Sequence, residues 1–489
     1  MLQARHILCA GASLVLPLPV LRGRAGVGVC SRRALSRNPH PNPPPEYRER
    51  EKKQSTTIIY VAIVLALAVI FTSTASAEDR AQRFPAPDFR SGYSLPQTQT
   101  PRLPWAGWQA VDVLMLATAL SLAAWFVLKK RSRAWTLGLT IGSLLYFGFW
   151  RKGCICPVGS IQNVAWAAAG HGYALPWTVA AFFLLPLLFS LYFGRVFCSG
   201  VCPLGAAQDL VLFKPLRVPT WLESALGLGA WAYLGLAVLF ASAGSDFVIC
   251  RYDPFVGFFR LGGPAHMLVA GALLLILCMF IGRAYCRFLC PYSVPLRLLA
   301  PFARKQVSIT PTNCIDCRLC EQSCPFGAIR YPSPKQTARR QRMSRRFALT
   351  AAAAAPALII AFAILAYPAR NSLARLDFTV RLAEQVTREQ TSSALIQSDE
   401  VKAFHATGQS TQQLYAAAEA IQRRFTWGAP IFGAWIGLAI WARLIAPIFR
   451  RRRSDYHADA SACVACARCF ASCPAELRTV EKQAELVAA

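Results

Sequence analysis

The chain is short of acidic residues and histidine: 24 aspartates and glutamates stand against 53 lysines and arginines, and 489 residues include 6 histidines. It has no GxxxxGK(S/T) segment and no GxGxxG segment after a strand, so nucleotide hydrolysis and a bound dinucleotide have no support. A haem-b quinol enzyme needs paired histidines inside membrane helices. The histidines here lie in the N-terminal tail, near the ends of apolar segments, in a polar loop and beside the last cysteine run: His6, His40, His171, His266, His405 and His457.

Hydrophobic residues are abundant instead, at 55% of the chain, and the mean hydropathy is +0.35. A membrane-spanning helix needs about 20 mostly apolar residues. Such segments lie at 108–128, 134–150, 175–194, 224–243, 265–283, 347–367 and 429–447. With an apolar segment ahead of them, they predict an α-helical polytopic membrane protein with about seven to eight transmembrane helices in a lipid bilayer.

The N-terminal region divides into three parts. Residues 1–50 are rich in arginine and proline and predict a disordered or non-native extension. Residues 51–77 begin with basic residues, continue as an apolar run and end in Ala75-Ser76-Ala77, which is typical of a signal peptide or of a first membrane anchor. Both alternatives place residues 78–107 in the periplasm.

The formal net charge of +29 follows the membrane segments. Short cytoplasmic loops collect lysine and arginine, and the basic stretches fall on alternate loops, at 129–133, 214–217, 339–346 and 450–453. The charge therefore indicates topology, and we expect no nucleic-acid partner. Arg151 and Lys152 lie on the outer side and break the rule.

The strongest chemical signal is a cysteine run that occurs twice. The C-x2-C-x2-C-x3-C-P spacing is that of bacterial ferredoxins, whose thiolates hold [4Fe–4S] clusters. A structural zinc site usually has two separated CxxC pairs instead. We predict two [4Fe–4S] clusters and eight metal ligands: Cys314, Cys317, Cys320, Cys324, Cys463, Cys466, Cys469 and Cys473.

The two runs are expected to form one cytoplasmic unit, with ferredoxin half 1 at 301–334 and half 2 at 454–489. Between them lies a transmembrane hairpin, 347–367 and 429–447, with a periplasmic loop at 368–428. In two-cluster ferredoxins the fourth cysteine of each run binds the other cluster. We therefore expect Cys324 to join the first three cysteines of the second run, and Cys473 to join those of the first.

A second repeat lies in the membrane core, 108–300. Two CxxxCP boxes each end an apolar segment after a Gly-Arg pair, and their cysteines are Cys198, Cys202, Cys286 and Cys290. Such duplication indicates an internal two-fold arrangement. The cysteines either cap helices as small apolar residues, or they converge on a further metal cluster or redox-active thiol set at the membrane boundary.

A weaker CxCP copy holds Cys154 and Cys156 at the outer surface, and Cys250 follows in a later outer segment. We expect these cysteines to form an exit toward a periplasmic acceptor. Arg151 and Lys152 would either stabilise a reduced anionic centre or attract the phosphate of a partner-bound flavin. An ordinary periplasmic disulfide involving Cys250 is the alternative.

These motifs, over about residues 108–480, resemble the membrane polyferredoxins of the NosR and NapH type. The resemblance implies a multi-pass electron-transfer protein of the bacterial inner membrane, with its clusters facing the cytoplasm and the eight run cysteines as ligands. NosR-type proteins carry a periplasmic flavin domain, and residues 78–107 are too few for one. We therefore expect no flavin on this chain and a periplasmic flavin-binding or reductase partner.

The function expected from the sequence is electron transfer between a cytoplasmic or membrane donor and a periplasmic acceptor, with no substrate-converting site visible. The alternative is an accessory factor that reduces a respiratory enzyme, or delivers metal to it, during its assembly.

Overall fold

The computed structural model describes residues 106–153, 156–262, 264–309, 317–330, 338–391, 398–445 and 456–474. The chain divides into two units, 1–51 and 52–489, and all described residues belong to the second. The predicted extension 1–50 and signal segment 51–77 lie outside the described residues, as do Cys154 and Cys314.

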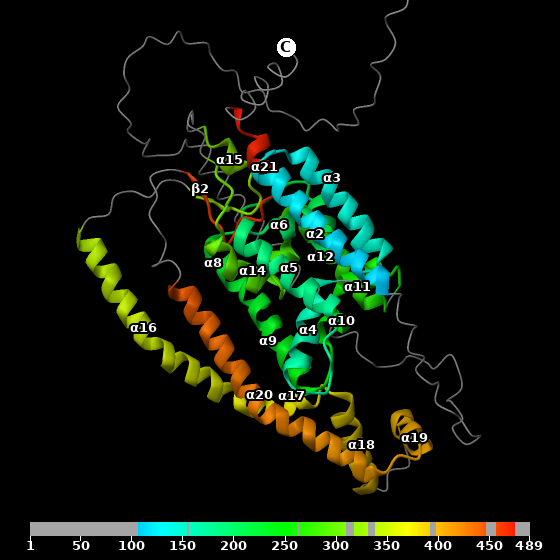
Figure 1. Cartoon of the computed structure of the whole chain (residues 1–489). Helices are drawn as coiled ribbons and strands as arrows, with labels where there is room; N and C mark the ends of the chain where they lie inside the picture. Colours follow the sequence, from blue (N-terminus) through cyan, green and yellow to red (C-terminus); the bar gives the residue numbers. More distant parts are fainter. Residues whose placement is uncertain are drawn as a thin grey trace, which may run out of the picture. The chain divides into compact units, whose positions relative to one another are not determined.

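The described chain is almost entirely helical (Figure 1). The first part of the membrane core contains α2 (Ala106–Leu128), α3 (Arg133–Ser143), the π-helix η1 (Leu144–Trp150), α4 (Pro157–Ala168), α5 (Trp177–Phe193), α6 (Val196–Gly200) and α7 (Pro203–Leu210). The second part contains α8 (Thr220–Leu226), α9 (Leu228–Ala243), α10 (Val248–Tyr252), α11 (Pro254–Phe259), α12 (Ala265–Phe280), α13 (Ala284–Phe288), α14 (Ser293–Leu299) and η2 (Ala300–Phe302).

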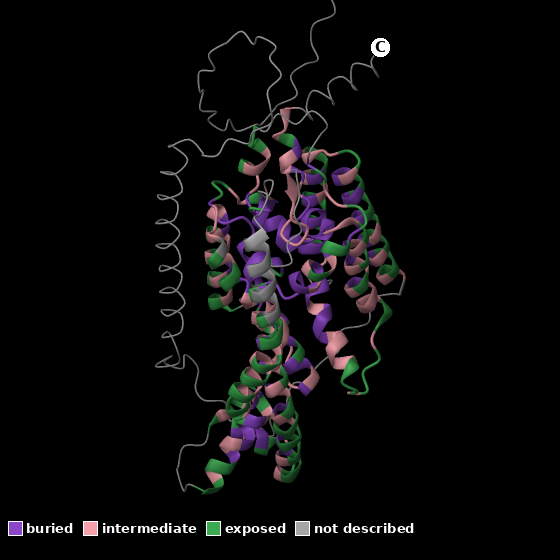
Figure 2. Cartoon of the chain, turned by 90° about the vertical axis from the view of Figure 1, so that its left-hand side faces the viewer, coloured by how far each residue is buried: buried purple, intermediate pink, exposed green. Residues whose placement is uncertain are grey.

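The rest of the chain contains α15 (Leu319–Gln322), β1 (Ile329–Arg330), α16 (Ala338–Ala366), η3 (Tyr367–Ala369), α17 (Arg370–Ala374), α18 (Phe378–Thr391), α19 (Asp399–Ala406), α20 (Thr411–Ile445), β2 (His457–Ala458) and α21 (Arg468–Ala471). Figure 2 shows that most buried residues lie inside the helix bundle of the membrane core, with a smaller buried group in the 368–428 loop.

Four helices among the described residues are long and apolar enough to cross a membrane: Gly107–Leu128, Trp221–Ala243, Ala352–Ala374 and Thr411–Ile445. Two shorter apolar helices, Trp177–Phe193 and Ala265–Phe280, fall at two further predicted segments. The predicted segment 134–150 is helical too, but it changes from α3 into the π-helix η1, a form usually found as a short local insertion. The membrane character is confirmed, and the count of seven to eight spans stays a prediction.

The helices α16 and α20 form the hairpin between the ferredoxin halves and pack along each other. Gly433 and Gly437 make the approach possible. A Cβ atom at Gly433 would overlap the carbonyl oxygen of Phe362, and one at Gly437 would lie 2.9 Å from that of Leu358. Small residues four apart are the usual means of bringing two membrane helices into backbone contact.

The 368–428 loop forms a helical layer with its own core. Apolar residues of α18, α19 and the first part of α20 pack together: Val380, Leu382, Ala383, Val386, Val401, Phe404, Leu414 and Ala418. Asp377 accepts hydrogen bonds from the backbone N–H of Thr379 at 2.7 Å and from the Ser245 hydroxyl at 2.6 Å. The carboxylate thus caps the start of α18 and ties the layer to the turn after α9.

The two ferredoxin halves meet although the hairpin separates them in sequence. Strands β1 and β2 pair antiparallel, with Ile329 opposite Ala458 and Arg330 opposite His457. The short helices α15 and α21 lie against each other (Figure 1). The chain therefore builds one ferredoxin-like unit from segments on both sides of the hairpin.

Candidate metal centres

Each CxxxCP box forms a break between two short helices. Cys198 lies in α6 and Cys286 in α13, while Cys202 is the N-cap of α7. Pro203 follows at the first position of α7, where a backbone N–H is not needed. Cys202 therefore occupies a helix-cap position, as the capping alternative expects.

The four box thiols are also brought together. All four cysteines are buried in one core cluster, and the thiol of Cys202 interacts electrostatically with those of Cys286, Cys198 and Cys290. Burial raises the pKa of Cys202 well above its ordinary value, and raises that of Cys286 to about 12. Ionising such thiols is costly unless a bound cation compensates the charge, as a metal does.

Gln208 organises this thiol set and was not predicted from the sequence. Its side chain is fully buried. Its Nε2 donates to the sulfur of Cys286 at 3.2 Å, and its Oε1 accepts from the backbone N–H of Tyr285 at 3.1 Å and from the Cys278 thiol at 3.5 Å. An N–H···S hydrogen bond to a ligand sulfur is a known means of tuning a metal centre.

The ferredoxin unit contains a second convergence of thiols. Cys324, Cys463, Cys466 and Cys469 line one small cavity with apolar neighbours. The thiol of Cys469 interacts electrostatically with those of Cys466, Cys463 and Cys324. Burial raises the pKa of Cys463 to about 12. This is the grouping expected from exchanged fourth cysteines, and metal binding by it stays a prediction.

The other predicted set is described only in part. Cys317 is exposed, Cys320 and Cys473 are half-buried, and Cys314 lies outside the described residues. Across the described ranges, no three histidine, cysteine or acidic side chains are close enough to share a single metal ion. The thiolates of a cubane each bind a different iron, so they stand farther apart than the ligands of one ion.

The backbone of the cysteine runs is held in an unusual conformation. Arg318, Ala465 and Ala467 have φ values of 58°, 55° and 61°, a left-handed conformation that costs a non-glycine residue about 1–2 kcal/mol. All three lie between cysteines of a run. Successive N–H groups in such turns form concave anion sites, and the N–H of Ala465 donates to the sulfur of Cys463 at 3.4 Å.

A buried ion network joins the box region to the second ferredoxin half. Asp209, in α7, pairs with Arg133 at 2.6 Å, with Arg468 at 3.1 Å and with Arg283 at 3.6 Å. Burial alone would raise the pKa of Asp209, but the three guanidinium groups hold it well below its usual range. Arg133 also donates to the carbonyl oxygen of Cys466 at 3.0 Å, so the network holds half 2 on the membrane core.

The cations around the thiols exceed the anions. Arg195 and Arg283 are 3% and 0% exposed, and Asp209 is the only carboxylate that the described ion pairs assign to this group. The Nε atoms of Arg195, Arg283 and Arg468 are buried without a hydrogen-bond partner among the described residues. Uncompensated buried cations are strongly unfavourable. A thiolate-ligated iron–sulfur cluster is anionic, so the residues present fit such a group.

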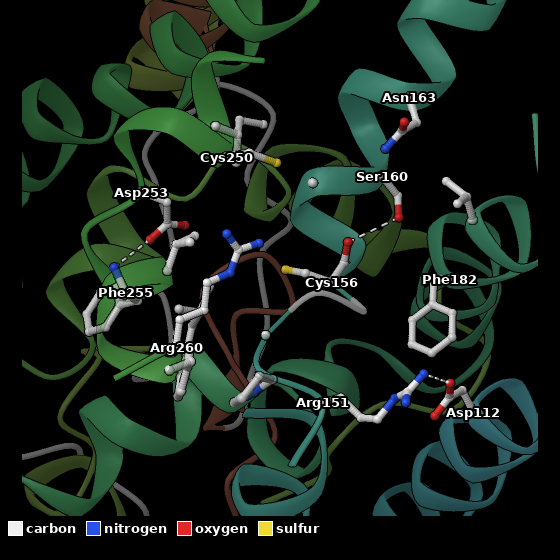
Figure 3. A pocket seen from close by; sticks show the side chains of 18 of the residues that line it. Asp112, Arg151, Cys156, Ser160, Asn163, Phe182, Cys250, Asp253, Phe255 and Arg260 are labelled. Carbon is white, nitrogen blue, oxygen red and sulfur yellow. Dashed lines mark hydrogen bonds and ion pairs between the residues drawn. The ribbon is translucent and has the colours of Figure 1, made fainter. Parts of the chain in front are cut away.

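Cys156 and Cys250 face a separate cavity of about 310 Å³ (Figure 3). Cys156 is the N-cap of α4, with Pro157 after it, and so repeats the local structure of the second box cysteine. A Cβ atom at Gly159 would lie 3.6 Å from the sulfur of Cys250. The start of α4 and the helix α10 therefore present two thiols to the same space.

Arg151 has an internal partner that the sequence did not suggest. It forms an ion pair with Asp112 at 2.5 Å, and the Asp112 side chain is 3% exposed. Arg151 thus already has a carboxylate partner inside the fold, and its role toward a reduced centre or an incoming phosphate stays a prediction. Arg260, which also lines the cavity, is exposed.

Comparison with known proteins agrees with these features. A family model described as a 4Fe-4S binding domain matches residues 175–220 and 264–309, which contain the two CxxxCP boxes. A second model with the same description matches residues 307–330. No solved structure matches the chain.

Two of the three relatives described next are named for electron transport or as ferredoxin-type proteins, and the third is named as a regulatory protein. The chain is 28% identical over 268 residues to YccM of Escherichia coli K12, named as an electron transport protein, covering 47% of this chain and 70% of YccM. It is 30% identical over 250 residues to the regulatory protein NosR of Pseudomonas aeruginosa, covering 45% and 34%. It is 28% identical over 179 residues to the methylamine utilization ferredoxin-type protein MauN of Paracoccus denitrificans, covering 35% and 61%.

The fold and the cysteine sites define a helical membrane protein with ferredoxin-type 4Fe–4S domains, of the class that serves electron transport. Its relatives and its 4Fe–4S domains support a likeness to the NosR/NapH type of ferredoxin-containing proteins, the resemblance that its motifs predict.

Proposed function

We propose that this protein carries electrons across the bacterial inner membrane, from a donor on the cytoplasmic side to a periplasmic flavin-containing or reductase partner. In this proposal both ferredoxin halves face the cytoplasm. One cluster is held by Cys314, Cys317, Cys320 and Cys473, the other by Cys463, Cys466, Cys469 and Cys324. A third is held by Cys198, Cys202, Cys286 and Cys290.

The proposal rests on the central position of the box thiols. The Arg283 guanidinium interacts electrostatically with the thiols of Cys286 and Cys466, which belong to the box set and to the ferredoxin unit. On the other side, the thiol of Cys290 interacts with that of Cys156, which faces the outer cavity. The described thiols therefore form a series and not isolated sites.

Transfer of an electron across a membrane requires a series of redox sites. The hydrocarbon layer is about 30 Å thick, too wide for one efficient electron transfer between its surfaces. A [4Fe–4S] cluster supplies a one-electron couple. The chain's own residues fix the thiols, exclude water from the buried sets and balance the negative charge with arginine. At the outer end, Cys156 and Cys250 lie where an acceptor could approach.

The first experiment tests the third cluster. The full chain is purified anaerobically in detergent, and its iron content and low-temperature EPR spectrum are measured. We expect a variant with both Cys202→Ser and Cys290→Ser to lose the iron of one cluster and keep the ferredoxin signals. Cys278→Ser is the matched control, because this buried cysteine lies beside the set without belonging to it. Unchanged iron in the double variant would refute the third cluster.

The second experiment tests transport. The full chain is reconstituted in liposomes with a trapped viologen dye, and a membrane-impermeant reductant is added outside. Repeated reduction of the trapped dye, lost in the double serine variant, supports steady electron flow. Reduction limited to one equivalent per protein contradicts it and favours the accessory role.

A further inference from the structure

Arg195 touches both the box thiols and the second ferredoxin half. It is the N-cap of α6 and its side chain is buried. One terminal nitrogen, Nη2, lies 3.6 Å from the sulfur of Cys198. The other, Nη1, donates to the carbonyl oxygen of Ser461 at 3.0 Å, and Ser461 is two residues ahead of Cys463.

The charge of Arg195 is shared between the two thiol sets. Its guanidinium also interacts electrostatically with the thiol of Cys463. The ion pairs of the described residues give Arg195 no carboxylate, and its buried Nε has no hydrogen-bond partner among them. Because burying an unpaired cation is strongly unfavourable, its compensation has to come from ligand sulfur on both sides.

The corresponding arginine of the second box, Arg283, has different bonding partners. Arg283 occupies the same place in its repeat, three residues before the first cysteine. It donates to the carbonyl oxygen of Cys198 and pairs with Asp209. The hydrogen bond and the ion pair of Arg283 are both to residues of the membrane core, whereas Arg195 has one terminal nitrogen on Cys198 and the other on Ser461 of ferredoxin half 2.

We propose that Arg195 is a positioning residue that couples the two cluster sites by contacting both through its two terminal nitrogens. The route runs from the sulfur of Cys198 through the guanidinium to the carbonyl of Ser461 and along the backbone to Cys463. This inference rests on the proposed cluster at the box thiols.

The step itself is a plain electron exchange. With clusters bound at both sites, the site that contains Cys463 would lose one electron and the site that contains Cys198 would gain it. No covalent bond forms or breaks, and Arg195 keeps its proton. The rate of electron transfer falls steeply where a route has to cross a gap with no covalent bond or hydrogen bond. Removal of the guanidinium opens such a gap and should therefore slow the exchange.

The test compares Arg195→Leu and Arg195→Lys with the wild-type chain, all purified with clusters. Iron content and EPR establish that both sites are filled, and redox titration gives their midpoint potentials. Freeze-quench EPR then follows arrival of the electron at the box site after rapid reduction of the ferredoxin unit. Arg217→Leu is the control, because Arg217 pairs with the side chain of Glu321 of half 1 at 3.3 Å and donates to its carbonyl oxygen at 3.0 Å.

We expect Arg195→Leu to keep both clusters and to slow the exchange at matched driving force, because the variant lacks the contacts at both ends of the route. If leucine empties the box site, Arg195→Lys decides, since one ammonium nitrogen keeps the charge but cannot span both partners. A wild-type rate in a filled variant overturns the coupling role and leaves the proposed function intact. Absence of iron at the box thiols of the wild-type chain overturns the proposed function itself.

Discussion

Three arginines converge on the carboxylate of Asp209, so Asp209→Asn tests what holds ferredoxin half 2 on the membrane core. Asparagine keeps the size of the side chain and removes the charge. Arg133 and Arg468 then lose their ion-pair partner, and Arg468 lies directly before Cys469. We expect half 2 to separate more readily from the core, exposing the cluster site lined by Cys469.

The magnitude follows from burial. Removing one partner of a buried ion pair costs about 3–5 kcal/mol. Asp209 and Arg283 have no exposed side-chain surface, but Arg133 and Arg468 keep 17% and 28% exposure, so water stabilises part of their freed charge. The lower value of about 3 kcal/mol therefore applies, which is about a hundredfold in the equilibrium for opening.

The effect should not depend on pH in the working range. The pKa of Asp209 is held below its usual range, so its stabilising contribution is complete above the unfolded value of about 3.9. The contribution is lost only as the pH falls through the lower folded pKa. The Asn variant should therefore be weakened equally at about pH 6 and about pH 8.

The assay is the rate of iron release to a chelator, measured anaerobically on the purified chain. Arg330→Gln is the control, because it breaks a pair with Asp459 at 3.8 Å whose side chains are 31% and 25% exposed. Such a pair contributes about 0–1 kcal/mol. Release from Asp209→Asn at the wild-type rate would show that the network does not hold the ferredoxin half.

Three other outcomes can be checked directly. Gly433→Leu should separate the α16–α20 hairpin and lower the iron content of the ferredoxin unit, whereas Gly142→Leu, where a Cβ meets nothing within 4 Å, should not. Gln208→Leu should keep iron at the box site but lower its midpoint potential in an EPR titration. In the wild-type chain the N–H···S bond from Gln208 stabilises the reduced, more negative state, and the variant lacks this bond. Burial raises the pKa of Asp253 to about 6, so its ionisation destabilises the fold as the pH rises from about 4 through 6. Asp253→Asn should raise the unfolding temperature fully at about pH 8, about half as much at about pH 5 and not at about pH 3, and Asp246→Asn should not raise it at any of these.

The sequence predicted what depends on local spacing. The ferredoxin runs and the CxxxCP boxes are short motifs whose geometry is set within a few residues, and the grouping of Cys324 with Cys463 followed from the ferredoxin pattern. The α16–α20 hairpin could be predicted because an apolar run of about 20 residues usually forms a membrane-spanning helix. The π-helix η1 was not predicted, since nothing in its composition differs from that of an α-helix.

The sequence did not reveal the polar residues that support the sites. Asp209 and Arg468 are 259 positions apart, and Asp112 meets Arg151 across 39 positions. Such pairs depend on tertiary contacts, and each residue alone looks like an ordinary helix-end side chain. One signal was available: acids are scarce in this chain, and Asp209 lies seven residues after Cys202.

The two boxes have similar sequences, but the side chains of their arginines contact different partners. Arg195 has a φ of −81°, whereas Arg283 has a left-handed φ of 52°, a conformation that costs about 1–2 kcal/mol. With this left-handed backbone, Arg283 contacts Cys198 and Asp209 inside the core, while Arg195 extends to Ser461 in half 2. Strain at a buried position persists only where surrounding contacts hold it. The duplicated motif thus yields an asymmetric centre, in which Arg195 reaches the ferredoxin unit and Arg283 stays inside the core.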